Sequence, residues 1–273
     1  MSRLPLHLDL IPMDLAWADA RANIRLMDEA IQSRMKERSD IPSDARVFVF
    51  PEVALTAFVT DRSGDVALPR LGPEVEAVRA LAGKYKTAIV FGFPERVEGQ
   101  EKPYNTLLFV SPQGEDLADY QKLHLYTASS PPESESYQHG QSGTVLTYRG
   151  WKIAFAICFD LRFSNLFHAY AQAGADLVVL PACWIGGPGK SVQLQTLSAA
   201  RAIEGQCFFA ALNRSGKDPS ASYEGEVLCF APRGEPLVEK TGFDLDSALL
   251  DEARKLKVRP SDLEEYPVVS VET

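Results

Sequence analysis

The sequence predicts a layered α/β fold in which helices lie outside the sheets. Short apolar runs end at proline or at a polar residue, segments between them have helical periodicity, and three segments resemble β-hairpins. Hydrophobic residues make up 45% of the 273 residues, which allows a sizeable core. Because no linker or composition break interrupts the chain, we expect a single domain over residues 1–273, with the polar residues after about 256 as a C-terminal tail.

Strands and helices alternate in the first part of the chain. The expected strands are residues 6–11, 47–50 and 87–93, and the expected helices are residues 19–34 and 73–85. Pro51 and Pro94 close the second and third strands in this interpretation, because proline cannot donate a hydrogen bond within a central ladder. Pro73 suits the first turn of a helix, so the second helix is expected to begin there.

Three pairs of apolar runs flank turn residues and predict β-hairpins. The pairs are residues 106–110 with 117–122, 145–148 with 152–157, and 226–230 with 236–239. The remaining expected elements are helices at residues 165–173 and 191–206 and strands at residues 176–180 and 207–213, the first of these strands ended by Pro181. Residues 127–143 have no period and predict an irregular loop, long enough to suspect a function.

The charge pattern argues against two classes of partner. The formal net charge is −9, and no stretch clusters lysine and arginine as phosphate-backbone binding requires. Residues 1–10 lack the basic region and long apolar core of a signal peptide, and no run approaches the roughly 18 apolar residues of a membrane span. We therefore expect a cytoplasmic protein that binds neither nucleic acid nor a membrane.

The cysteines and histidines do not predict a metal site. Cys158, Cys183, Cys207 and Cys229 stand singly, without the close pairs of a zinc site or the density of a disulfide scaffold. The four histidines are not at helical metal-ligand spacing. We expect reduced cysteines and no bound metal, so a hydrolase of this sequence would use side-chain chemistry.

Three polar residues stand out because each follows an apolar strand: Glu52, Lys122 and Cys158. Strand ends gather active sites in α/β folds, and a thiol, a base and a fixed positive charge together suit acyl transfer. Each residue also has an ordinary structural interpretation. The cysteine could be a small core residue, the lysine a solvated side chain and the glutamate part of a surface turn.

The segments around these three residues carry a more specific signal. They read Phe-Pro-Glu at 50–52, Tyr-Gln-Lys-Leu-His-Leu at 120–125 and Ile-Cys-Phe-Asp-Leu-Arg-Phe at 157–163. In order and separation they resemble the three catalytic motifs of the nitrilase (carbon–nitrogen hydrolase) superfamily. Residues 104–106, 150–153, 200–204 and 212–214 also look like landmarks of that family. The segment around Cys158 is especially similar to the ω-amidase and deaminated-glutathione-amidase branch.

The resemblance implies a four-layer α-β-β-α sandwich, dimerised so that two sandwiches stack, and no cofactor. Glu52 would take the proton of Cys158, and the thiolate would attack an amide carbonyl. Lys122 and the backbone N–H of Phe159 would hold the oxyanion. Ammonia leaves to give a thioester, which water activated by Glu52 would hydrolyse. The charge of Lys122 is expected to favour the thiolate.

The resemblance also implies roles for residues around the trio. Many members carry a second glutamate, and Glu133 fits its spacing best, being seven positions before Gly140, with Glu135 as the alternative. Both glutamates could instead be solvated loop acids.

Arg162 would clamp a substrate carboxylate, or alternatively pair with Asp160 or Glu52 as scaffold. Asp160 itself is expected to be structural. Cys183 and Trp184 are expected to border the pocket, with cysteine where relatives commonly have asparagine.

The expected function is an amidase that releases ammonia from the terminal amide of a small carboxylate-bearing substrate, such as 2-oxoglutaramate. Deaminated-glutathione amidase is a close alternative, and nitrile or N-carbamoyl hydrolysis would use the same trio. A silent binding subunit is disfavoured because all three residues are present. A redox protein would instead pair Cys158 with Cys183. We expect a small-molecule amide as substrate and a homodimer or higher homo-oligomer as the assembly.

Overall fold

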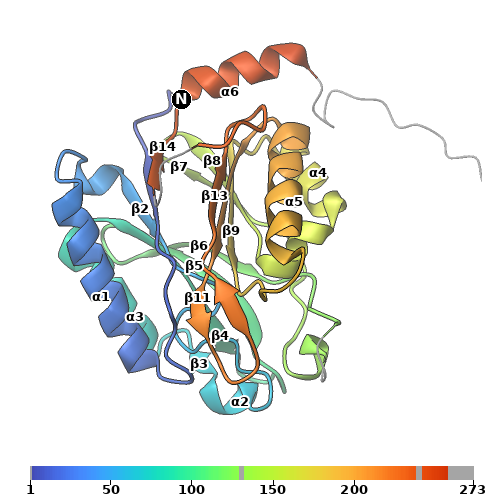
Figure 1. Ribbon diagram of the computed structural model, residues 1–273. Helices are drawn as coiled ribbons and strands as arrows, with labels where there is room; N and C mark the ends of the chain where they lie inside the picture. Colours follow the sequence, from blue (N-terminus) through green and yellow to red (C-terminus); the bar gives the residue numbers. More distant parts are fainter. Residues whose placement is uncertain (1, 129–131, 238–241, 258–273) are drawn as a thin grey trace, which may run out of the picture.

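Figure 1 shows the computed structural model, which describes residues 2–128, 132–237 and 242–257. Two β-sheets pack face to face and helices cover both outer faces, so the predicted four-layer α-β-β-α sandwich is confirmed. The first sheet is covered by α1 (Ala20–Glu37) and α3 (Pro73–Tyr85). The second is covered by α4 (Ser164–Gln172) and α5 (Lys190–Gly205).

The first sheet has the strand order β14-β1-β2-β4-β5-β6, with β3 also paired to β4. Its strands are β1 (His7–Leu10), β2 (Arg46–Val49), β3 (Leu68–Pro69), β4 (Ala88–Arg96), β5 (Tyr104–Val110), β6 (Asp116–Gln121) and β14 (Gly242–Asp244). The neighbours β1, β2 and β4 are parallel, whereas β5 and β6 continue the sheet as the antiparallel hairpin that the sequence predicted.

The second sheet has the order β13-β10-β9-β8-β7. Its strands are β7 (Val145–Tyr148), β8 (Trp151–Phe155), β9 (Leu177–Ala182), β10 (Phe208–Asn213) and β13 (Val227–Phe230). The central strands β8, β9 and β10 are parallel. A separate two-stranded ribbon consists of β11 (Ser215–Lys217) and β12 (Ser222–Glu224).

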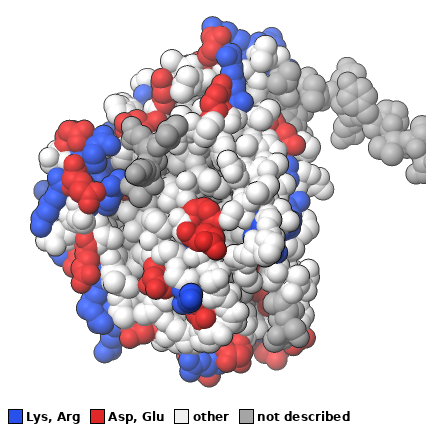
Figure 2. Space-filling view, in the orientation of Figure 1, with Lys and Arg blue, Asp and Glu red and all other residues white. Residues whose placement is uncertain are grey.

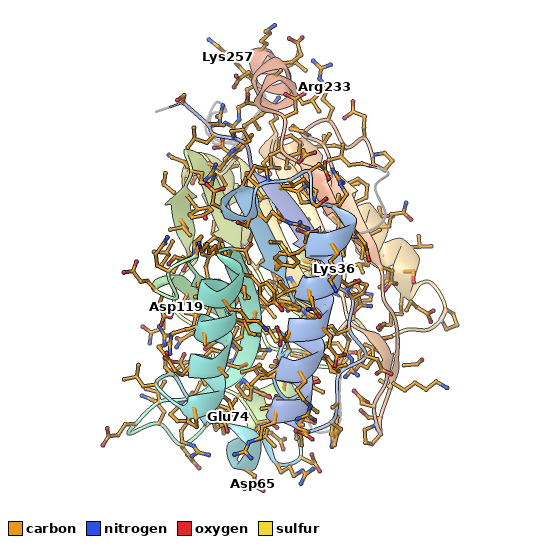
Figure 3. The ribbon with its side chains drawn as sticks, turned by 90° about the vertical axis from the view of Figure 1, so that its left-hand side faces the viewer. Lys36, Asp65, Glu74, Asp119, Arg233 and Lys257 are labelled. Carbon is orange, nitrogen blue, oxygen red and sulfur yellow. The ribbon has the colours of Figure 1, made fainter. Side chains whose placement is uncertain are left out.

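Alternation along the strands builds two cores on the faces of the first sheet. Val47 and Val49 of β2 belong to the cluster shared with the second sheet. Phe48 points to the opposite face and packs with Met27 and Ile31 of α1. In Figure 3, α1 and α3 lie side by side across this outer face. The strands are therefore buried on both faces, which explains why they appear in the sequence as continuous apolar runs.

Two predicted strand ends were wrong, because Pro94 lies within β4 and Pro181 within β9. The backbone explains both. The carbonyls of Val90 and Gly92 accept hydrogen bonds from Phe50 and Leu55, which follow β2. Every second residue of a strand points its backbone groups to the same side, so the nitrogen of Pro94 also faces that side, beyond the end of the pairing with β2. In the same way the nitrogen of Pro181 faces β8, whose pairing with β9 ends at Val179. Neither proline removes a ladder hydrogen bond.

Several short elements were not predicted. They are β3, β11, β12, β14, the short helices α2 (Ser63–Val66) and α6 (Ser247–Ala253), and the 3₁₀ helices at Ser43–Ala45, Glu133–Glu135, Cys158–Arg162 and Arg254–Leu256. The third predicted hairpin is only partly present: Pro236 bridges to Phe230, but β13 pairs along its length with β10. Residues 238 and 239 of its second arm, and the tail after residue 257, lie outside the described residues.

No helix in the part of the chain that the structure describes is long and apolar enough to cross a bilayer. On the face shown in Figure 2, acidic and basic side chains are intermixed and do not form a continuous basic area.

Candidate active site

Glu52, Lys122 and Glu133 form one buried charged cluster. The Nζ of Lys122 lies 2.8 Å from Oε1 of Glu52 and 2.9 Å from Oε2 of Glu133. All three residues are almost fully buried. Glu52 follows β2, Lys122 follows β6, and Glu133 comes from the 3₁₀ helix in the long loop. Glu135, the alternative to Glu133, is exposed and takes no part in the cluster.

The charges of the cluster depend on one another. Burial alone would lower the pKa of Lys122, but the carboxylates of Glu133 and Glu52 raise it well above its usual value. Lys122 is therefore a permanent cation. Burial raises the pKa of Glu133, and the charge of Lys122 acts in the opposite direction.

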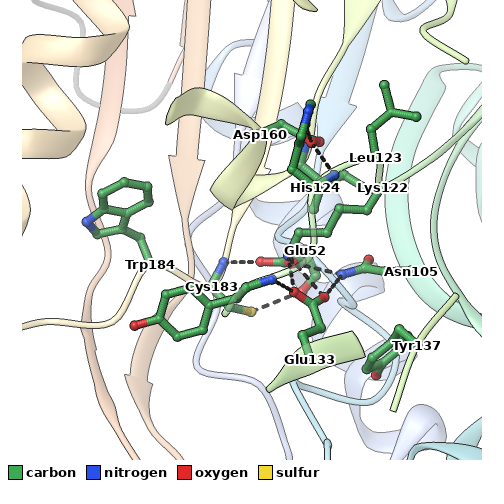
Figure 4. Close-up of polar contacts among 12 residues, drawn as sticks. Glu52, Asn105, Lys122, Leu123, His124, Glu133, Tyr137, Asp160, Cys183 and Trp184 are labelled. Atoms are coloured by element: carbon green, nitrogen blue, oxygen red, sulfur yellow. Dashed lines mark hydrogen bonds and ion pairs between the residues drawn. The ribbon is translucent and has the colours of Figure 1, made fainter. Parts of the chain in front are cut away.

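Asn105 joins the two carboxylates and was not predicted as a site residue. Its Nδ2 donates to Oε1 of Glu52 at 2.8 Å and to Oε1 of Glu133 at 3.4 Å (Figure 4). The backbone N–H of Tyr126 also donates to Glu133, at 2.6 Å. The sequence signal for Asn105 was the family-like triplet at 104–106, but that triplet does not reveal that the amide points into the site.

Cys158 sits on a strained turn directly after β8. Its φ of 46° places it in the left-handed region, which is uncommon for a residue with a side chain and is often found at functional sites. Asp160 holds this turn: its Oδ2 accepts from the backbone N–H of Ile157 at 2.9 Å and from the Tyr120 hydroxyl at 2.7 Å. Its Oδ1 accepts from the backbone N–H of His124 at 2.9 Å, which supports the structural role expected for Asp160.

The thiol of Cys158 is protonated in the resting site. Burial raises its pKa well above the usual value, and the neighbouring charge of Glu52 raises it further. Lys122 lowers the pKa, as the sequence predicted, but its effect is smaller. Lys122 therefore favours the thiolate, as expected, but burial and the charge of Glu52 outweigh its effect. Glu52 lies beside the thiol in the same pocket and is a candidate base for it.

Cys183 contacts Glu52 from the second sheet. Its backbone N–H donates to Oε2 of Glu52 at 2.6 Å, and its Sγ donates to the backbone carbonyl of Glu52 at 3.4 Å. The backbone contact fixes the carboxylate, whatever side chain occupies this position. Burial raises the pKa of the Cys183 thiol well above its usual value.

The predicted residues converge on one pocket. It is lined by Glu52, Phe58, Lys122, Tyr126, Cys158, Phe159, Arg162, Cys183, Trp184, Ile185 and Lys190. Phe58, Tyr126, Ile185 and Lys190 had not been singled out as site residues. Glu133 does not line the pocket and contacts it through Lys122. In the described residues, no three histidine, cysteine or acidic side chains are grouped to hold a metal ion.

Among the described residues, Arg162 forms an ion pair with neither Asp160 nor Glu52, the two acids that could have been its scaffold partners. Asp160 accepts from Tyr120 and from main-chain groups instead. The guanidinium of Arg162 lies 4.8 Å from the centre of the Trp184 ring and donates to Oε1 of Gln193 at 2.7 Å. Its charge is therefore directed at the pocket with no carboxylate bonded to it among the described residues.

Comparison with known proteins identifies the family to which the chain is similar. The profile of the carbon-nitrogen hydrolase family matches residues 10–251. The chain is 30% identical to the omega-amidase YafV of Yersinia enterocolitica over 264 residues, 96% of this chain and 94% of that protein. It is 40% identical to the deaminated glutathione amidase of Escherichia coli O157:H7 over 104 residues, 38% of this chain and 40% of the relative.

A solved structure has the same fold. A CN-hydrolase superfamily protein from Xanthomonas campestris superposes with a TM-score of 0.83 at 24% identity, covering 97% of this chain and 100% of that chain. The family match includes the segments that hold Glu52, Lys122 and Cys158. The chain is therefore a hydrolase of carbon–nitrogen bonds and belongs to the carbon-nitrogen hydrolase family of the nitrilase superfamily.

Proposed function

We propose that this protein hydrolyses the terminal amide of a small carboxylate-bearing substrate, such as 2-oxoglutaramate, to the acid and ammonia through a thioester on Cys158. The observation that carries the proposal is the buried Glu52–Lys122 pair beside the Cys158 thiol, in a pocket whose exposed side carries an unpaired arginine. The similarity to omega-amidase YafV over 96% of this chain supports the same reaction.

In the first half of the reaction Glu52 takes the proton of the Cys158 thiol as sulfur attacks the amide carbon. The C–S bond forms and the carbonyl π electrons move to oxygen, where Lys122 and the backbone N–H of Phe159 stabilise the negative charge. When the C–N bond breaks, its electrons go to nitrogen, and Glu52 returns the proton to that nitrogen. Ammonia leaves and a thioester remains.

In the second half Glu52 takes a proton from a water molecule, whose oxygen attacks the thioester carbon. The same donors stabilise the second oxyanion. Its collapse breaks the C–S bond, the acid is released, and the proton held by Glu52 returns to sulfur. One carboxylate thus serves as base and acid in both halves, which is consistent with a resting thiol that is protonated.

Glu133 and Asn105 act as positioning residues in this proposal. Lys122 donates to both Glu133 and Glu52, so its ammonium is held by two carboxylates. Asn105 donates to Glu52 and keeps its carboxylate oriented. Neither needs to touch the substrate, because fixed geometry is itself a large part of catalysis.

Arg162 is proposed to bind the substrate carboxylate, with Trp184 holding its guanidinium plane. An arginine that binds a carboxylate would favour carboxylate-bearing substrates over neutral amides and simple nitriles. Deaminated glutathione stays the main alternative, because its amidase from Escherichia coli is 40% identical over 38% of this chain.

The protein is further proposed to act in the cytoplasm as a homodimer. All four cysteines are free thiols, as is usual in a reducing compartment. Exposed Val192 and Ile203 give α5 an apolar outer face on which a second sandwich could stack.

The test is ammonia release from 2-oxoglutaramate, deaminated glutathione, glutamine, an N-carbamoyl amino acid and a simple nitrile, with Cys158→Ala as the control. Deaminated glutathione is scored by release of its amine. Turnover of 2-oxoglutaramate that disappears in Cys158→Ala would support the proposal. Preference for deaminated glutathione would favour the alternative substrate. Folded protein inactive on all five would overturn the proposed reaction.

A further inference from the structure

Lys190 is a second cation at the exposed side of the same pocket. It is the first residue of α5, is half-buried and lines the pocket together with Cys158 and Arg162. Its backbone is fixed, because its carbonyl accepts from Nε1 of Trp184 at 3.0 Å. Its ammonium makes no ion pair with any described residue, and the first turn of α5 contains no acidic residue.

Glu226, which bonds the neighbouring Ser191, makes no ion pair with Lys190. Glu226 bonds neutral groups: its Oε1 accepts from the Ser191 hydroxyl at 2.6 Å and its Oε2 from Nδ2 of Asn213 at 2.6 Å. Arg162 is similar, because its side chain donates a hydrogen bond to the neutral amide oxygen of Gln193. Two positive charges therefore border the pocket without a bonded carboxylate among the described residues.

This arrangement is unusual for the chain. Acidic residues outnumber basic ones by 37 to 28, and most buried or half-buried arginines, such as Arg46, Arg70 and Arg79, are paired with carboxylates. Unpaired cations at a pocket attract an anionic ligand and raise its local concentration. The buried acids of the pocket do not compete, since Lys122 holds Glu52.

Trp184 connects the two cations. Its ring lies against the guanidinium of Arg162, with 4.8 Å between Cζ and the ring centre, while its Nε1 donates to the Lys190 carbonyl. Gln193, one helical turn after Lys190, holds the other side of the guanidinium. The guanidinium and the first turn of α5 are thus fixed by the same aromatic residue before any ligand binds, which reduces the ordering cost of binding.

We propose that Lys190 and Arg162 together form a two-cation site for the carboxylate at the far end of the acyl group, with Lys190 as a specificity-determining residue. Arg162 offers a planar fork and Lys190 a point charge to the same anion. The substrate class is then the monoamides of short dicarboxylic acids. This rests on the proposed function for the reaction, although the anion site can be tested without turnover.

The test compares glutaramate with glutaramide. The two molecules have the same shape, but glutaramate carries a carboxylate where glutaramide carries a neutral carboxamide. Calorimetric binding is measured in Cys158→Ala, alone and combined with Lys190→Met, Lys190→Arg or Lys36→Met. We expect Cys158→Ala to prefer glutaramate and Lys190→Met to reduce that preference by about tenfold, as expected for loss of one charge-assisted contact. Lys190→Arg should restore most of the preference.

Lys36 is the matched control, because it is an exposed lysine on α1, in the opposite outer layer. Its substitution removes one positive charge and should leave the preference unchanged. Equal loss in Lys36→Met and Lys190→Met would indicate a net-charge effect and would overturn the assignment. An unchanged preference in Lys190→Met would overturn it as well.

The two proposals fail separately. If the unsubstituted protein is inactive on all five substrates of the first test but Cys158→Ala shows a Lys190-dependent preference, the anion site stands and the proposed reaction is wrong. If both amides are hydrolysed but the ratio of kcat/KM values is the same in Lys190→Met, the reaction stands and the role of Lys190 is wrong.

Discussion

Cys158 is the proposed nucleophile, and ionisation of its thiol should depend on Glu52 in a defined direction. Burial and the Glu52 charge both raise the thiol pKa. We expect the thiolate absorbance difference between the unsubstituted protein and Cys158→Ala to show no step up to about pH 9, where a free cysteine is largely ionised. Glu52→Gln removes a charge that raises the pKa, so the step should move to lower pH although turnover is lost.

Cys183→Ser is the control for this titration, since it replaces a second thiol in the pocket and should leave the Cys158 step in place. A thiolate at neutral pH in the unsubstituted protein would contradict the expectation. It would mean that the positive charge of Lys122 outweighs burial and Glu52 together.

Glu133 is expected to act through Lys122, and Glu135 provides a close control. Glu133→Gln removes one of two charges that hold the ammonium at 2.8–2.9 Å, so kcat should fall by about 10²-fold, in the range of losing one electrostatic group of an active site. The exposed Glu135→Gln should stay within about twofold of the unsubstituted protein. Steady-state ammonia release measures both, and equal effects would argue against a special role for Glu133.

Individual residues differ in how far the sequence could predict them. Glu52, Lys122 and Cys158 were found because each ends an apolar run and carries a family-like segment. Glu133 could not be separated from Glu135 by physics alone, because only burial in the folded loop distinguishes two loop acids two positions apart. Asn105 and Lys190 were missed as site residues, because their roles depend on non-local neighbours.

At the scale of elements, a glycine in β4 allows the segment after β2 to approach closely. A Cβ on Gly92 would lie 2.5 Å from the backbone nitrogen of Val53 and 3.3 Å from the carbonyl carbon of Glu52. Gly92→Ala should therefore displace Glu52, lowering stability by about 1–3 kcal/mol as overpacking does, and reducing kcat as well. Urea unfolding and ammonia release measure the two effects.

Gly83 in α3 is the matched substitution, because a Cβ there meets no atom within 4 Å. Gly83→Ala should stabilise the protein by about 0.5–1 kcal/mol through helix propensity and leave kcat unchanged. If Gly92→Ala changed stability and kcat in the same way as Gly83→Ala, the position of the Glu52 carboxylate would not depend on the close approach of β4 to the segment after β2.

Long elements were predicted and short ones were not. The helices α1, α3, α4 and α5 have enough turns for periodicity to appear in the sequence. In contrast, β3 has two residues and β14 three; β3 pairs with the end of β4 and β14 with β1, so both depend on strands already formed. The misplaced ends at Pro94 and Pro181 have the same origin, since whether a proline interrupts a strand depends on how far its neighbour extends.

At the scale of the whole molecule, the candidate site depends on how the two sheets face each other. Glu52 and Lys122 follow strands of the first sheet, whereas Cys158 and Cys183 follow strands of the second. The hydrogen bond from Cys183 to Glu52, at 2.6 Å, joins the two sheets at the Glu52 carboxylate. No local pattern predicts this arrangement, which follows from packing the large apolar cluster between the sheets.

The proposed dimer can be tested on the outer face of the second helical layer. Ile203 of α5 is 51% exposed, and Leu26 of α1, in the opposite layer, is 38% exposed. If two sandwiches stack through α5, Ile203→Glu places an unpaired charge in an apolar interface and should raise the dimer Kd by roughly 100-fold. Leu26→Glu changes the same kind of surface and should leave the assembly unchanged. Sedimentation velocity over a concentration series measures both, and a monomeric unsubstituted protein, or equal effects of the two substitutions, would rule out this interface.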